Sequence, residues 1–161
     1  MQTIKIGKES KPTEDAIAQI GGFGDCPPEV YDLLKKVCRD IEELQFLGKF
    51  SIKVIFRKKE KTSKGMRVLG TASVFPERDK LLHPWDALVV LDEAYWAANP
   101  TKRKALLCHE LCHFDVDAEG NLKGKNHDIE EFLLVLKHFG DWQGDVRRIN
   151  QTQLEMGFEA L

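Results

Sequence analysis

Hydrophobic and polar residues recur along the chain with two different periods, which predict where helices and strands lie. Between residues 26 and 48 the apolar positions return every three or four residues, the spacing of one helix face. Prolines at the start and Gly48 at the end are typical helix boundaries. We therefore expect an amphipathic helix, whose apolar face consists of Val30, Leu33, Leu34, Val37, Cys38, Ile41 and Leu44.

Three shorter segments have the composition of β-strands. Residues 50–57 alternate apolar and polar side chains, which predicts a half-buried strand. A lysine-rich turn follows, and residues 66–75 are interpreted as the strand that returns from it. Residues 87–91 are uniformly apolar, which suits either a strand covered on both faces or an edge strand beside a cleft. We expect a three-stranded sheet.

The second half of the chain is predicted to be mainly helical. A short helix over residues 92–98 precedes Asn99-Pro100, a helix-start signal, and the helical segment 101–114 follows. A last helix is expected over residues 128–140. The order of an N-terminal helix, three strands and further helices indicates an α+β fold.

Composition narrows the class of protein. The 161 residues suit one domain; we expect a loosely ordered N-terminal arm over residues 1–25 and a single domain over residues 26–161. A net charge of −2 excludes a polycation that coats nucleic acid. No segment has the length of a signal peptide core or a membrane span. We expect reduced cysteines and a cytoplasmic location.

The segment His109-Glu110-Leu111-Cys112-His113 carries the chemistry. Two histidines four residues apart project from the same face of a helix and can hold one divalent ion together. The glutamate between them lies close enough to accept a proton from water on that ion. This HExxH pattern predicts a zinc site with Glu110 as the general base.

A catalytic zinc ion takes three protein ligands and a water molecule, so a third ligand must follow HExxH. His127 is the first candidate because a glycine-containing, hairpin-like loop brings the chain back towards the helix. Glu131 ranks second and Glu130 third, one turn into the last predicted helix. Cys108 and Cys112 point about 100° away from the histidines and are expected to be buried core residues.

Several of these segments together resemble the phage metallopeptidases, a small zincin family related to the SprT-like proteases. The resemblance covers about residues 64–142 and rests on Val89-Val90-Leu91, Trp96, residues 102–107, HExxH and residues 126–132. It implies a small zincin-like domain with an active-site helix, and His127 as the third zinc ligand. The chain departs from SprT-like proteins in having Asp128 after that histidine and in lacking a zinc ribbon.

The leading hypothesis is therefore a zinc-dependent endopeptidase. Zn²⁺ is expected to bind His109, His113 and His127, and Glu110 to activate water. An extended polypeptide substrate is expected to pair with a strand edge. The predicted substrate-binding residues are Leu88, Val89, Val90 and Leu91. If the protein comes from a phage, as the resemblance implies, it acts in the host cytoplasm.

A second hypothesis assigns the zinc fold a scaffolding role in binding DNA or a host protein, without proteolysis. Residues 57–67 contain six basic residues and one acidic residue and are predicted to lie at the tip of a hairpin. They could contact phosphates, although a solvated turn is the more common explanation of such a run. The candidate nucleic-acid-binding residues are Arg57, Lys58, Lys59, Lys61, Lys64 and Arg67.

Overall fold

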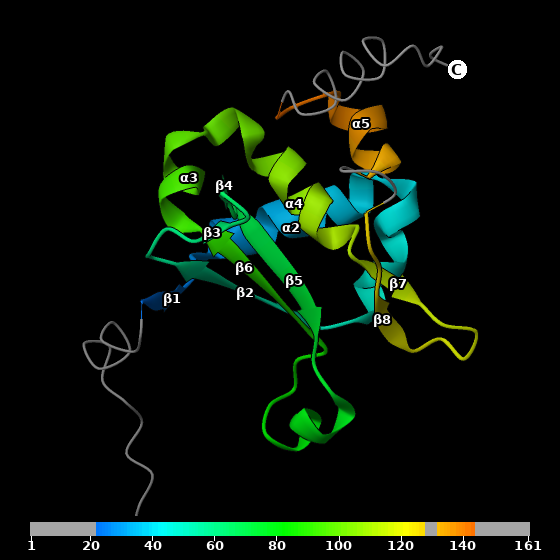
Figure 1. Cartoon of the computed structure of the whole chain (residues 1–161). Helices are drawn as coiled ribbons and strands as arrows, with labels where there is room; N and C mark the ends of the chain where they lie inside the picture. The colour runs from blue at the N-terminus through cyan, green and yellow to red at the C-terminus, as the bar shows by residue number, and fades with distance from the viewer. Residues whose placement is uncertain (1–21, 128–131, 144–161) are drawn as a thin grey trace, which may run out of the picture.

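The computed structural model describes residues 22–127 and 132–143, and its centre is a four-stranded sheet (Figure 1). The strands are ordered β1-β2-β6-β5, so β6 lies inside the sheet and β5 at one edge. β2 and β6 run parallel, whereas the two outer pairings are antiparallel. The strands are β1 (Phe23–Asp25), β2 (Ile52–Arg57), β5 (Gly70–Val74) and β6 (Ala87–Asp92).

The strand predicted at residues 66–75 is present as β5, but its predicted pairing with residues 50–57 is wrong. β5 pairs with β6, and β6 occupies the position beside β2. Between β2 and β5 the chain forms a small separate ribbon of β3 (Thr62–Ser63) and β4 (Met66–Arg67). The uniformly apolar β6 suits the interior of the sheet, whereas the small and polar residues of β5 suit an edge.

The sheet also has a strand that the sequence pattern did not predict. β1 falls within the expected N-terminal arm and adds an antiparallel strand beside β2. Residues 1–21, the rest of that arm, lie outside the described residues.

The first helix is shorter than predicted. α2 (Pro28–Asp40) ends where Ile41 takes extended backbone angles, φ −108° and ψ 110°. A 3₁₀ segment, η1 (Glu42–Lys49), continues the chain. Both segments still bury the predicted apolar face, with Leu33 half-buried and the other residues of that face buried.

The helices of the second half follow the predicted order. They are α3 (Glu93–Ala98), the 3₁₀ turn η3 (Pro100–Lys102), α4 (Arg103–Leu111) and α5 (Leu133–Phe139). A hairpin of β7 (Phe114–Val116) and β8 (Leu122–Gly124) separates α4 from α5. The last helix was predicted to start at residue 128; residues 128–131 lie outside the described residues.

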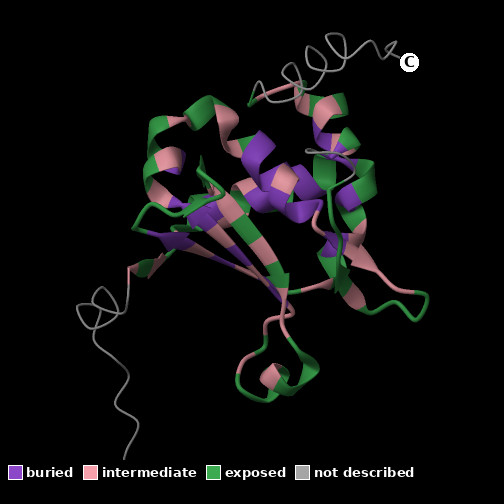
Figure 2. Ribbon diagram, viewed as in Figure 1, coloured by how far each residue is buried: buried purple, intermediate pink, exposed green. Residues whose placement is uncertain are grey.

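The helices gather on one side of the sheet, where α4 contacts α2, α5 and the edge strand β5 (Figure 1). Alternate residues of β2 and β6 face them and are buried, and the buried surface is concentrated around α4 (Figure 2). α4 itself is almost wholly buried from Ala105 to Leu111. The molecule is thus a mixed α/β protein whose central helix is fixed from several sides. In its described part, no helix is long and apolar enough to cross a membrane.

Candidate metal centre

Helix α4 carries the first half of HExxH in its last turn. His109 and Glu110 lie within the helix, which ends at Leu111. His113 follows the helix end, where its N–H donates to the carbonyl of Glu110 at 3.2 Å. The ring centroids of His109 and His113 lie 5.4 Å apart, so the two side chains remain neighbours although the motif outlasts the helix.

The β7–β8 hairpin returns the chain to these two histidines. The Lys125 N–H donates to the carbonyl of His113 at 2.6 Å, and the Lys125 carbonyl lies 2.9 Å from Nδ1 of His113. A proton on Nδ1 that is donated to this carbonyl leaves Nε2 of His113 as the metal-binding nitrogen. Lys125 therefore holds the backbone of His113 through its N–H and orients the imidazole through its carbonyl.

His127 lies next to His109 because of this return. Its Nε2 is 2.9 Å from Nε2 of His109, and its ring centroid is 4.7 Å from that of His113. One nitrogen from each of the three histidines falls within 4.8 Å of the others, so the three residues could hold a metal ion. Three imidazoles form a common donor set for catalytic zinc, which keeps a fourth position for water.

The other candidate ligands do not join this cluster or cannot be placed. Glu130 and Glu131 lie outside the described residues. Cys108 and Cys112 are buried, as predicted, and do not belong to the group of ligand atoms found in the described part of the chain. The geometry therefore brings together the two histidines of HExxH and His127, the first-ranked candidate for the third ligand.

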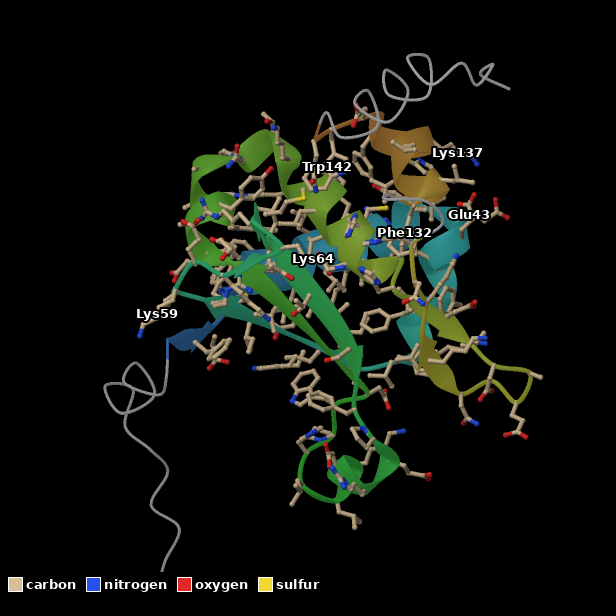
Figure 3. All side chains as sticks on the ribbon, in the orientation of Figure 1. Glu43, Lys59, Lys64, Phe132, Lys137 and Trp142 are labelled. Atoms are coloured by element: carbon tan, nitrogen blue, oxygen red, sulfur yellow. The ribbon has the colours of Figure 1, made fainter. Side chains whose placement is uncertain are left out.

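Phe132 supports the three histidines, a role that the sequence did not reveal. Its side chain is 1 % exposed, and its ring centroid lies 4.9 Å from those of His113 and His127 and 5.5 Å from that of His109. All three contacts are edge-to-face. The ring of Trp142 also lies beside His109, with centroids 6.4 Å apart. Figure 3 labels Phe132 and Trp142. The family resemblance included Phe132 at the end of the element 126–132 but gave it no role of its own.

Glu110 occupies a buried position between α4 and the edge strand β5. Its side chain is 2 % exposed, and a Cβ atom on Gly70 would lie only 2.6 Å from Oε1 of Glu110. The carboxylate therefore lies against the backbone of β5. Sequence reasoning assigned no role to Gly70.

The prediction that residues 88–91 pair with substrate is wrong. Leu88, Val89, Val90 and Leu91 belong to β6, which pairs with β2 on one side and β5 on the other. Both edges of β6 are thus occupied, and a further strand cannot hydrogen-bond to it. The uniformly apolar composition of this segment reflects its interior position in the sheet.

Two of the basic residues assigned to nucleic-acid binding form hydrogen bonds with other groups of the protein. Arg57 is 7 % exposed, donates to the carbonyls of Lys59 and Val68, and lies 3.7 Å from Asp92. Arg67 donates to both carboxylate oxygens of Asp92, at 2.8 and 2.9 Å. Both guanidinium groups thus contact the buried carboxylate of Asp92. Arg57 is itself buried and cannot reach phosphates, whereas Arg67 keeps an exposed side chain.

The lysines of the same run remain exposed, and Lys59 projects away from the sheet (Figure 3). Lys58, Lys59, Lys61 and Lys64 lie on or next to the β3–β4 ribbon. Exposed lysines are common in solvated turns. No observation favours nucleic-acid binding over a solvated turn as the reason for these four lysines.

Cys26 and Cys38 are unreactive thiols. Burial raises the pKa of Cys38 to about 11. Burial also raises the pKa of Cys26, to about 12, against the opposing charge of Lys53. Because the thiolate is the reactive form, neither residue is a nucleophile near neutral pH.

The fold and the site define a mixed α/β protein with a three-histidine centre able to hold a metal ion. The buried Glu110 of helix α4 lies beside this centre. The chain belongs to the family described as putative phage metallopeptidase, whose sequence model matches residues 25–150. No curated protein and no solved structure matches the chain. The family description agrees with the metal-binding geometry and indicates a hydrolase that acts on polypeptides.

Proposed function

We propose that the protein is a zinc-dependent endopeptidase with a zincin-like active site, acting in the host cytoplasm. The observation that carries this proposal is the convergence of His109, His113 and His127 beside Glu110, which shares helix α4 with His109. HExxH followed by a third ligand is the arrangement in which zinc activates water for amide hydrolysis. Membership in a phage metallopeptidase family supports the same reaction class.

The residues present fit a zinc ion. Neutral imidazole nitrogens bind zinc well, and the contact between His113 Nδ1 and the Lys125 carbonyl orients one of them. When bound, zinc acts as a Lewis acid and lowers the pKa of a coordinated water towards about 7. The edge-to-face packing of Phe132 holds the three rings in place.

Glu110 supplies the proton transfers of the proposed reaction. Its carboxylate accepts a proton from the attacking water and passes it to the departing amine, so the same residue acts first as base and then as acid. α4 fixes the backbone of Glu110, and its burial keeps the side chain in a restricted space. The residue thus acts from a position that the fold defines before substrate arrives.

The outer edge of β5 is the proposed docking strand for substrate. In the described residues no strand pairs with this edge. The Leu69 carbonyl accepts from the Asp92 N–H of β6, and the Phe75 N–H donates to the carbonyl of Asp86, just before β6. Because antiparallel strands alternate in this way, the backbone groups of Gly70, Ala72 and Val74 point to the outer edge. An extended peptide could pair there and pass beside Glu110.

The ligand set is tested by metal content. We expect purified protein to contain close to one zinc ion per chain and to hydrolyse an unfolded protein such as casein. His127→Ala should lose both properties because only two imidazoles remain. Glu131→Ala, changed in the neighbouring segment, should keep both. Elemental analysis after dialysis, with casein cleavage followed in parallel, measures the two effects.

A chelator provides the control for metal dependence. Removal of zinc should stop cleavage by the wild-type protein, and added zinc should restore it. Loss of zinc in Glu131→Ala but not in His127→Ala would contradict the proposed ligand set. A zinc-loaded wild-type protein that leaves casein and unstructured peptides intact would contradict the proposed activity.

A further inference from the structure

Gly70 begins β5, and its backbone does not require glycine. The glycines with positive φ in the described residues are Gly22, Gly65, Gly120 and Gly140, so Gly70 has backbone angles open to any residue. Glycine weakens a strand, because it loses more conformational freedom on folding and offers no side chain to pack. A glycine in such a strand often marks the close approach of another group.

The group that approaches is the side chain of Glu110. A Cβ on Gly70 would lie 2.6 Å from Oε1, 2.8 Å from Cδ and 3.0 Å from Cγ of that residue. Real Cβ atoms essentially never lie that close to a heavy atom. The space that a side chain at position 70 would occupy is therefore filled by the carboxylate of the proposed general base.

The backbone on the strand side of this contact is fixed. The carbonyl of Leu69 accepts a hydrogen bond from the Asp92 N–H at 2.8 Å, and the carbonyl of Val68 accepts one from Arg57. Gly70 itself is paired in register with Leu91. Asp92 and Arg57 thus hold the segment that leads into β5, and the strand cannot easily retreat from an added side chain.

The helix side of the contact is equally restricted at the backbone. Glu110 lies in α4 between residues of the same helix that are fully buried, such as Leu107 and Leu111. An added methyl group at position 70 must therefore be accommodated by a different rotamer of Glu110. That change would move the carboxylate away from its present place beside β5.

We infer that Gly70 is a positioning residue for Glu110, whose missing side chain fixes where the carboxylate lies. The role in catalysis rests on the proposed function, whereas the packing relation between the two residues does not. Gly70 also presents its backbone to the outer edge of β5, so the same residue places the base beside the peptide bond that would pair there. Gly70 therefore links the docking strand to the proton-transfer group.

The kinetic test compares Gly70→Ala with Gly48→Ala, a glycine of η1 that has nothing within 4 Å of an added Cβ. We expect Gly70→Ala to reduce kcat about 10- to 100-fold, since a displacement of about 1 Å has effects of that size. KM should stay within about twofold and zinc content should be unchanged, because ground-state binding and the histidines are not altered. Gly48→Ala should behave as the wild type.

The second test uses the purified full-length protein and needs no activity. Thermal unfolding of four forms is compared: wild type, Gly70→Ala, Glu110→Ala and the double variant. Gly70→Ala should lower Tm by about 3–8 °C in the presence of Glu110, because of overpacking. In the Glu110→Ala background the same change should leave Tm equal or slightly higher, since the overlapping atoms are gone.

These outcomes separate the inference from the proposed function. If no form hydrolyses peptides but the unfolding cycle shows the rescue, the packing relation holds and the endopeptidase proposal fails. If Gly70→Ala lowers Tm equally in both backgrounds, or fails to fold in both, the strain lies elsewhere and the inference is overturned. Unchanged kcat in Gly70→Ala would also overturn it.

Discussion

Replacement of Glu110 by glutamine is expected to reduce peptide hydrolysis by about 10²- to 10⁴-fold, the usual contribution of a general acid–base residue. Glutamine has nearly the same shape, so it should fit the space between α4 and Gly70. It cannot accept the proton of the attacking water. Zinc content should remain close to one per chain, because the three histidines are unchanged. Hydrolysis of a quenched fluorescent peptide and elemental analysis measure the two properties.

A matched control distinguishes the lost base from a general effect of lost charge. Glu42 is exposed at the start of η1, and Glu42→Gln makes the same chemical change away from the histidines. This variant should keep wild-type activity. Cleavage by Glu110→Gln at the wild-type rate would eliminate Glu110 as the base.

The largest expected effect on stability comes from Asp92. Its carboxylate is 2 % exposed, accepts two hydrogen bonds from Arg67 and one from the Tyr95 N–H, and lies 3.7 Å from Arg57. Asp92→Asn leaves the buried Arg57 without a counter-charge. Loss of one member of a buried ion pair costs about 3–5 kcal/mol. We expect that loss in the free energy of unfolding at pH 7, measured with urea.

The pH dependence of this effect follows from the pKa of Asp92. Burial by itself would raise that pKa, but the hydrogen bonds from Arg67 and Tyr95 and the charges of both arginines lower it below the ordinary value of 3.8. A carboxylate with a lowered pKa stabilises the fold at any pH above its unfolded value. The difference between wild type and Asp92→Asn should persist at pH 5 and shrink as the pH falls below about 4.

Asp25→Asn is the control for this measurement, because it also removes a carboxylate paired with a cation. The Asp25 side chain is 65 % exposed and lies 3.0 Å from Lys53. Exposed pairs contribute about 0–1 kcal/mol, so the control should unfold almost as the wild type does. Equal losses in the two variants would show that the Asp92 cluster is not a special source of stability.

The part of the site that could be predicted from sequence is the part that depends on local spacing. The two histidines of HExxH are neighbours because they lie four positions apart on nearly helical backbone. His127 could be ranked first because a hairpin signal lies between it and His113, and the hairpin is present. The apolar face of the first helix could also be predicted, although Ile41 ends that helix early.

The parts that were missed depend on contacts between distant segments. The proximity of Gly70 to Glu110, 40 positions later in the chain, requires the order of strands in the sheet. That order was mistaken because a lysine-rich turn suggested a simple hairpin, whereas β6 takes the place beside β2. Likewise, the charges of Arg57 and Arg67 suggested a surface role because the sequence did not show that Asp92 lies between them.

The strand order also has a consequence for the kinetics of folding. β2 and β6 pair in parallel with 29 residues of chain between the end of one and the start of the other, and β5 lies within that interval. A contact of this sequence separation forms slowly, because the loop must close before any strand bond compensates its entropy. Among the described residues, β5 forms strand pairing with β6 alone, so this pairing must wait for β6. Among the strands of the main sheet, the one that borders Glu110 is therefore expected to be ordered late, after the centre of the sheet has formed.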